Sequence, residues 1–200
     1  MWQVILDGGI MMIPLAISSI LALTIMFERI YSLQRRKVIK PETVTIVDNI
    51  QNHDDVKMAV SICEKNGDTF SKIVLAALQA ETLNNVEVKE AVEDQGRQEV
   101  ARLEKGLVLL ETIAAIAPLL GLLGTVLGMI EVFDVITIEG EARTASLSSG
   151  ISQALITTVA GLSIGIIALV SYNYFSNKAE NLVLDIEKFS TQLVKKIRSF

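Results

Sequence analysis

Residues 112–130 read TIAAIAPLLGLLGTVLGMI, a run without a charge that is bounded by Glu111 and Glu131. A helix of about 20 apolar residues, rising about 1.5 Å per residue, crosses a hydrocarbon core that is roughly 30 Å thick. Residues 8–27 and residues 144–177 carry no charge either, and they meet the same criterion. Three such stretches in 200 residues predict an all-α integral membrane protein with three transmembrane helices, rather than a soluble protein with buried helices.

The composition excludes several classes of protein. Half of the residues are hydrophobic and 20% are charged, which excludes intrinsic disorder. The net charge of −5 offers no basic surface for nucleic acid. One Cys and one His exclude a disulfide scaffold and disfavour a His-rich metal centre. The apolar stretches hold no His, Cys, Asp or Lys, so we expect no catalytic residues, no metal and no cofactor, and a protein that is not an enzyme.

Basic residues indicate the orientation of the chain. Five of them lie within residues 28–40, directly after the first apolar stretch. Because Lys and Arg favour the cytoplasmic side of a span, the N-terminus is predicted outside and the C-terminus inside. The predicted segments are an outer N-terminus (1–7), a transmembrane helix (8–27), a cytoplasmic helical region (28–105), a second transmembrane helix (106–133), an outer loop (134–146), a third transmembrane helix (147–176) and a cytoplasmic C-terminal helix (177–200).

The polar residues between the first two spans are predicted to be helical. The helix of the first span is expected to continue to about Lys40, and Pro41 suits the first turn of the next helix. Residues 54–65 predict a short helix that ends near a glycine. Asp68 suits the N-cap of a further helix over residues 69–83.

One long helix is predicted over residues 86–133, because no turn cluster interrupts it before Pro118. Its length would be on the order of 70 Å. Gly96 and Gly106 are weak points in this helix, and Pro118 is interpreted as a kink or a packing notch. The tail over residues 177–200 is predicted to be an amphipathic helix that packs on another helix or on a neighbouring subunit.

Small residues form a stripe on each of the second and third spans. Inside lipid, helices associate through close packing of small residues and through interhelical hydrogen bonds. The stripe of the second span comprises Ala117, Gly121, Gly124, Thr125 and Gly128, and that of the third comprises Gly150, Ala154, Thr158, Gly161 and Gly165, with Thr157 at its edge. Both stripes therefore place threonine near the middle of the membrane.

Two interpretations of these threonines stay open. In the first, the stripes only pack helices together, and each hydroxyl donates to the carbonyl four residues earlier. In the second, the hydroxyls of Thr125 and Thr158, with Thr157 as a third, line a polar path for an ion. A hydroxyl does not carry a proton as a charge at physiological pH. The second interpretation therefore requires an ion carrier from another chain.

Three further polar residues lie toward the ends of these spans. Glu111 and Glu131 flank the second span, where an ion pair at the membrane surface competes with a role in an ion relay. Gln153 lies near the outer end of the third span, roughly 100° around the helix from Ala154. All three are candidate residues of the channel mouths.

Two runs together resemble a known family. APLLGLLGTVLGMI (117–130) and GISQALITTVAGLSIGIIA (150–168) are similar to the two signature spans of the MotA/TolQ/ExbB proton-channel family. The resemblance covers the whole chain, including the three spans and the long polar insertion. Three spans resemble ExbB and TolQ, whereas MotA has four.

The resemblance implies a function and partners. It implies a homopentamer in the bacterial inner membrane, with its N-terminus periplasmic, around copies of a single-span ExbD- or TolR-like partner whose intramembrane Asp carries the proton. Proton motive force would then energise a TonB-like protein and, through it, outer-membrane transport. A TolQ-like subunit acting with a Tol-Pal-like protein in envelope integrity or cell division is the alternative, as is a non-conducting membrane scaffold.

The resemblance also implies roles for single residues. The two pore threonines of the family fall on Thr125 and Thr158. A glutamate that is often present in the family falls on Gln153, which cannot titrate. Either this glutamate is dispensable, or the branch to which this chain belongs relies on the partner's Asp and on hydroxyls alone.

Overall fold

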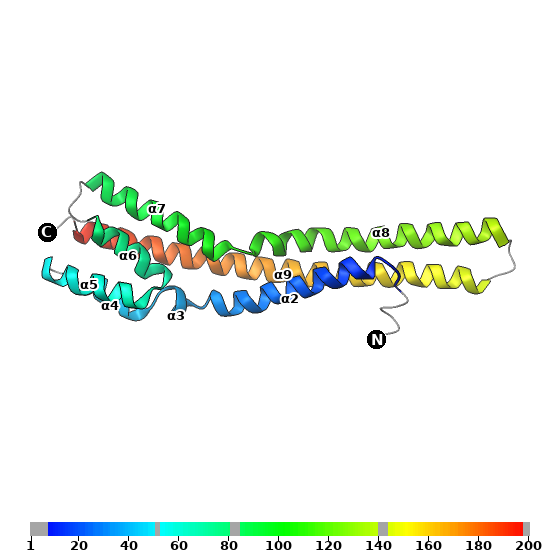
Figure 1. Ribbon diagram of the computed structural model, residues 1–200, viewed down its shortest axis with the longest axis horizontal. Coiled ribbons are helices and arrows are strands. Elements are labelled where there is room, and N and C mark those ends of the chain that lie inside the picture. Colours follow the sequence, from blue (N-terminus) through cyan, green and yellow to red (C-terminus); the bar gives the residue numbers. More distant parts are fainter. Residues whose placement is uncertain (1–7, 51–52, 81–84, 140–143, 198–200) are drawn as a thin grey trace. The chain divides into compact units, whose positions relative to one another are not determined.

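The computed structural model describes residues 8–50, 53–80, 85–139 and 144–197, and these residues form an all-α structure without strands (Figure 1). Its helices are α2 (Met12–Ser32), α3 (Arg35–Val38), α4 (Pro41–Asn49), α5 (His53–Asn66), α6 (Thr69–Gln79), α7 (Asn85–Glu104), α8 (Leu107–Glu139) and α9 (Thr144–Ile197). The chain divides into two compact units. The membrane unit holds the described residues up to Phe27 together with Gly106–Tyr174, and the polar unit holds Glu28–Lys105 and the rest of α9.

The predicted fold class is confirmed by three helices that are long and apolar enough to cross a membrane. They correspond to α2, α8 and α9. Large apolar side chains on these helices are exposed, among them Leu119 (62%) and Ile166 (61%). Such exposure is costly in water but suits contact with lipid.

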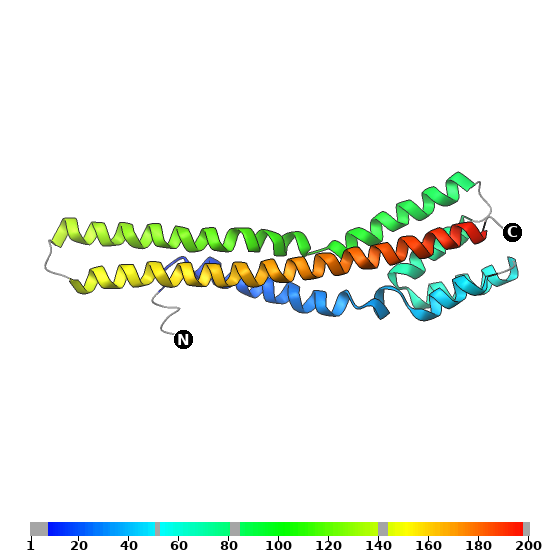
Figure 2. The same cartoon turned by 180° about the vertical axis from the view of Figure 1, so that it is seen from behind.

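Helices α8 and α9 run antiparallel and side by side in the membrane unit, as Figures 1 and 2 both show. Their contacts pair Gly128 with Ala154 and Gly121 with Gly161. Residue numbers therefore fall along α8 as they rise along α9, which is the register of an antiparallel pair. At these points the helices approach within van der Waals contact of backbone atoms, because neither glycine has a side chain.

The polar unit has a conventional hydrophobic core, to which Phe70 of α6 contributes a fully buried ring. This ring packs on Phe189 of α9 with centroids 5.6 Å apart. Asp68 caps α6 as predicted, because its carboxylate accepts a hydrogen bond from the backbone N–H of Ser71. Pro41 begins α4, also as predicted.

The prediction that the first span continues as a helix to Lys40 is wrong. Helix α2 ends at Ser32, and Gln34 is extended before the short α3. Leu33 is fully buried and Val38 is 3% exposed, so the turn lets both side chains enter the core of the polar unit. Burial of these two residues outweighs the modest helix propensity of the segment.

The helix predicted over residues 86–133 is interrupted at Gly106, one of its two predicted weak points. Helix α7 ends at Glu104, and α8 begins at Leu107 after Gly106, whose φ of +83° only glycine adopts readily. The terminal carbonyls of α7 are satisfied by the buried side chain of Arg29, whose Nη1 donates to the carbonyl of Leu103 at 2.8 Å. The second weak point, Gly96, lies inside α7 without a break.

Two further predictions concern α6 and the C-terminal part of α9. Helix α6 ends at Gln79, and the end predicted at residue 83 falls outside the described residues. The amphipathic tail is the direct continuation of the third apolar helix, since α9 runs unbroken from Thr144 to Ile197. Its residues Leu182, Ile186 and Leu193 are buried in the polar unit.

Candidate functional site

The candidate site is the contact between α8 and α9, where glycines of each helix lie directly against backbone atoms of the other helix. A Cβ placed on Gly161 would lie 2.5 Å from the carbonyl oxygen of Ala117 and 2.9 Å from the Cα of Gly121. A Cβ on Gly128 would lie 3.1 Å from the Cβ of Ala154. The structure thus brings the small-residue stripes of the two helices together, as close packing in lipid requires.

Pro118 belongs to the same contact. Helix α8 continues through it, and its ring lies 2.6 Å from where a Cβ on Gly165 would stand. Proline leaves the carbonyl four residues earlier, that of Ala114, without its usual helical donor. That carbonyl lies against Gly165, 3.2 Å from the same Cβ position, so it faces α9.

Thr157 lies inside the contact. Its side chain fills the space left by Gly124, where an added Cβ would stand 2.5 Å from the Thr157 Oγ1, and the residue is 1% exposed. Its hydroxyl donates to the carbonyl of Ala154 at 2.9 Å and to that of Gln153 at 3.3 Å. In this chain Thr157 is a packing residue whose hydrogen-bonding needs are met within its own helix.

Thr125 and Thr158 are only half-buried. The Thr125 hydroxyl donates to the Leu122 carbonyl at 2.6 Å, and the Thr158 hydroxyl donates across the contact to the Gly121 carbonyl at 3.3 Å. The register of the contact places Thr158 level with Gly124, so the two threonines differ in height by only about one residue's rise, about 1.5 Å. Each hydroxyl oxygen keeps lone pairs that can accept a hydrogen bond.

Gln153 packs on the N-terminal end of the described chain. Its side-chain amide stands against Gly9, whose φ is +67°, and a Cβ on that residue would overlap the amide. Gly9 therefore leaves the space that the Gln153 amide occupies, and a larger residue at position 9 would not. Glu111 and Glu131 are exposed on α8.

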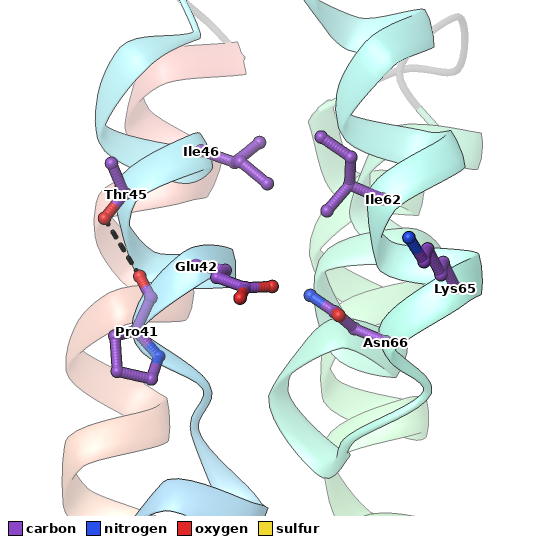
Figure 3. A pocket seen from close by; sticks show the side chains of 7 residues that line it. All are labelled: Pro41, Glu42, Thr45, Ile46, Ile62, Lys65 and Asn66. Carbon is purple, nitrogen blue, oxygen red and sulfur yellow. Dashed lines mark hydrogen bonds between the residues drawn. The ribbon is translucent and has the colours of Figure 1, made fainter.

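Outside the membrane unit, a groove of about 570 Å³ lies between α4 and α5 (Figure 3). It is lined by Pro41, Glu42, Thr45, Ile46, Ile62, Lys65 and Asn66. Ile46 and Ile62 project toward each other from the two helices, and Glu42 projects toward Asn66. These side chains include no Cys, Ser or His and no set of metal ligands, and no cluster of metal-ligating residues occurs elsewhere in the described ranges.

A buried ionic cluster in the polar unit was not predicted from the sequence. The side chain of Glu99 is 1% exposed and accepts hydrogen bonds from Arg102 Nη1 at 2.6 Å and Lys72 Nζ at 3.3 Å. The Glu99–Arg102 spacing of three residues is a signal for a helical ion pair. The contact with Lys72 joins residues 27 apart, and the sequence gives no signal for it.

Cys63 gives a prediction that depends on burial. Burial, reinforced by the charge of Asp68, raises the pKa of its thiol to about 11, and a hydrogen bond with Ser71 opposes this only in part. The thiol is therefore almost wholly protonated at pH 8, and we expect it to react with iodoacetamide at least about a hundredfold more slowly than an exposed cysteine. The matched control is a cysteine introduced at the exposed Ser61 of the same helix. Equal alkylation rates of the two thiols, measured by mass spectrometry of the folded protein, would contradict the buried position of Cys63.

The fold and this contact define a class of protein: a multi-pass membrane protein whose second and third spans pack through glycine and carry hydroxyls but no ionisable group at mid-membrane. The chain belongs to the MotA/TolQ/ExbB proton channel family, whose model matches residues 65–188. Proteins of this family are channel or energising subunits, so the chain is not an enzyme.

Individual relatives agree with this assignment. The chain is 38% identical to the putative biopolymer transport protein ExbB-like 1 of Synechocystis, over 84% of this chain and 67% of that protein. It is 29% identical to a putative ExbB homolog of Methanothermobacter thermautotrophicus, over 97% of this chain and 67% of that protein. It is 37% identical to the Tol-Pal system protein TolQ of Pseudomonas aeruginosa, over 43% of this chain and 37% of that protein.

Proposed function

We propose that this chain is the stator subunit of a proton-driven motor, conducting protons together with a single-span ExbD- or TolR-like partner that carries an intramembrane Asp. The observation that carries the proposal is the level placement of two half-buried hydroxyls, on Thr125 and Thr158, in helices without an ionisable residue at that depth. Because hydroxyls solvate a charge but do not titrate near neutral pH, the titrating acid must come from another chain.

The energetics suit such a device. One charge that crosses the potential gains about 2.3 kcal/mol per 100 mV. An Asp of the partner would be protonated where it faces lipid, because burial in a low dielectric disfavours the charged form, and ionised where it faces hydroxyls and water. Alternation between these two environments would couple proton entry and exit to movement of the partner within a ring of subunits, which we propose to be a homopentamer.

The process that receives the energy is proposed from the relatives. The alignments with the Synechocystis ExbB-like protein and the Methanothermobacter ExbB homolog cover 84% and 97% of this chain, whereas the alignment with TolQ covers 43%. We therefore favour a role in energising a TonB-like protein and outer-membrane transport over a TolQ-like role with a Tol-Pal-like protein. In either role the chain would lie in the inner membrane with a periplasmic N-terminus and a cytoplasmic C-terminus.

The experiment that tests the proposal is proton flux into liposomes. The chain is co-purified with the single-span, Asp-bearing protein encoded nearest to its gene, and flux is driven by a potassium diffusion potential. We expect potential-dependent acidification with the wild-type partner and none when the partner's Asp is replaced by Asn. Equal flux with both partners would overturn the proposed carrier, and absence of flux with either would favour the membrane scaffold.

A further inference from the structure

A polar cavity of about 380 Å³ lies in the polar unit beside the end of α2. Six charged residues line it: Glu28, Lys37, Asp68, Lys72, Glu99 and Arg102. They come from α2, α3, α7, α6 and the cap of α6, so residues distant in sequence meet at one place. The proposed proton pathway gives this cavity no role.

The charges in the cavity are not equally available to a ligand. Glu99 is buried and engaged by Arg102 and Lys72, and Asp68 is buried as the cap of α6. The side chains of Arg102 and Lys72 are 60% and 39% exposed, and each uses one donor on Glu99. A guanidinium has five N–H donors and an ammonium has three, so both exposed cations keep N–H donors that Glu99 does not use.

Lys37 adds a third cation. Its ammonium stands over the ring of Tyr31, which also lines the cavity, and it forms a side-chain hydrogen bond with Tyr31, so two of its three N–H donors stay available. Among the three acids, only Glu28 is substantially exposed, with 52% of its side chain accessible, and it already pairs with Arg29. The cavity therefore offers mainly cationic donors to a ligand, in a set of three that suits the oxygens of a phosphate.

The place of the cavity along the chain points to a lipid. Glu28 follows the last apolar residue of the uncharged stretch 8–27, and Arg102 lies five residues before the apolar start of α8 at Leu107. Glu28 thus adjoins one uncharged stretch, and Arg102 lies ten residues, or about three helical turns, before the uncharged stretch 112–130, so both positions are near the membrane surface, where phospholipid headgroups lie. Tyr31 is 66% exposed there, as aromatic residues at membrane surfaces often are.

We propose that this cavity binds the phosphate diester of a phospholipid headgroup through Lys37, Lys72 and Arg102. The bound lipid would hold the end of the first span at a fixed depth against α6 and α7. The proposal needs insertion of the chain in a membrane but not proton conduction, so failure of the flux experiment above leaves it standing.

The test measures lipid binding to the full-length protein in non-ionic detergent by native mass spectrometry. The probes are phosphatidylethanolamine, diacylglycerol with the same acyl chains, and water-soluble glycerophosphoethanolamine. We expect phosphatidylethanolamine to bind at least about tenfold more tightly than diacylglycerol, because charge-assisted hydrogen bonds exist only in the former complex. Tight binding of glycerophosphoethanolamine by itself would support the phosphate site and identify a soluble phosphate ester as its ligand.

Variants separate this site from general affinity for lipid. The double variant Lys37→Gln/Arg102→Gln should bind phosphatidylethanolamine no more tightly than diacylglycerol. Lys37→Gln alone should weaken binding of phosphatidylethanolamine in part. If the double variant does not fold because Glu99 has lost its ion pair with Arg102, the Lys37→Gln variant still tests the site. The control Lys89→Gln removes an equally exposed cation of α7 that pairs with Glu93 away from the cavity, and it should bind as the wild type does. Wild-type affinity in Lys37→Gln and the double variant, or equal affinity of the wild type for both lipids, would overturn the proposal.

Discussion

The Thr158→Val variant is expected to conduct protons at least about tenfold more slowly than the wild type while assembling normally with its partner. Valine keeps the shape of threonine and removes only the hydroxyl, so packing against Gly121 is preserved. The lost interaction is the hydrogen bond that the Thr158 hydroxyl would donate to an ionised partner Asp in place of its long bond to the Gly121 carbonyl, and such a bond is worth roughly 1.5–3 kcal/mol. Thr125→Val should have an effect of the same size, since its hydroxyl lies at nearly the same height. The measurement is the potential-driven flux into liposomes described above.

Thr157→Val is the matched control for this prediction. It removes the same hydroxyl from the adjacent residue, but that hydroxyl is buried and bonded to its own helix. Conduction should therefore stay within about twofold of the wild type, with at most a modest loss of stability. Similar flux losses in Thr157→Val and Thr158→Val would mean that hydroxyls matter for packing alone, and full flux in both Thr125→Val and Thr158→Val would exclude a role for them in conduction.

The membrane unit could be predicted from the sequence because lipid imposes simple rules on it. A span needs about 20 apolar residues, and close helix contacts need small residues, so both are visible in one dimension. Thr157 and Thr158 could not be told apart in this way. They are neighbours that differ by roughly 100° around the helix, and which one enters the contact depends on the rotation of α9 against α8.

The polar unit was less predictable because its geometry depends on distant partners. Arg29 donates a hydrogen bond to the carbonyl of Leu103, 74 residues later, at the end of α7. Lys72 donates to the carboxylate of Glu99, 27 residues later. Gly106 was visible as a weak point, but only the conformation that breaks the helix there makes its role evident. The end of α2 at Ser32 likewise follows from the burial of Leu33, which local propensity does not report.

Gly161→Ala is expected to lower the free energy of unfolding of the membrane unit by about 1–3 kcal/mol or more, and to reduce conduction with it. The added methyl group would stand 2.5 Å from the Ala117 carbonyl oxygen and 2.9 Å from the Gly121 Cα. Both are backbone atoms, so no rotation of a side chain can relieve the overlap, and α8 must move away from α9. The measurement is unfolding of the purified protein in mixed micelles as the denaturing detergent is increased.

Alanine substitutions at two other glycines test whether overlap across the contact between α8 and α9 causes this loss of stability. At Gly124 the nearest atoms to an added Cβ are the Thr157 Oγ1 at 2.5 Å and the Thr157 Cβ at 2.7 Å. Rotation of the Thr157 side chain moves the first atom but not the second, so Gly124→Ala should also destabilise the membrane unit, by an amount similar to Gly161→Ala. At Gly96, inside α7, nothing lies within 4 Å of the added atom, and alanine should stabilise the helix by roughly 0.5–1 kcal/mol. If Gly161→Ala unfolds at the wild-type detergent fraction, or if Gly96→Ala proves the most damaging of the three, then backbone contact between α8 and α9 does not hold the membrane unit together.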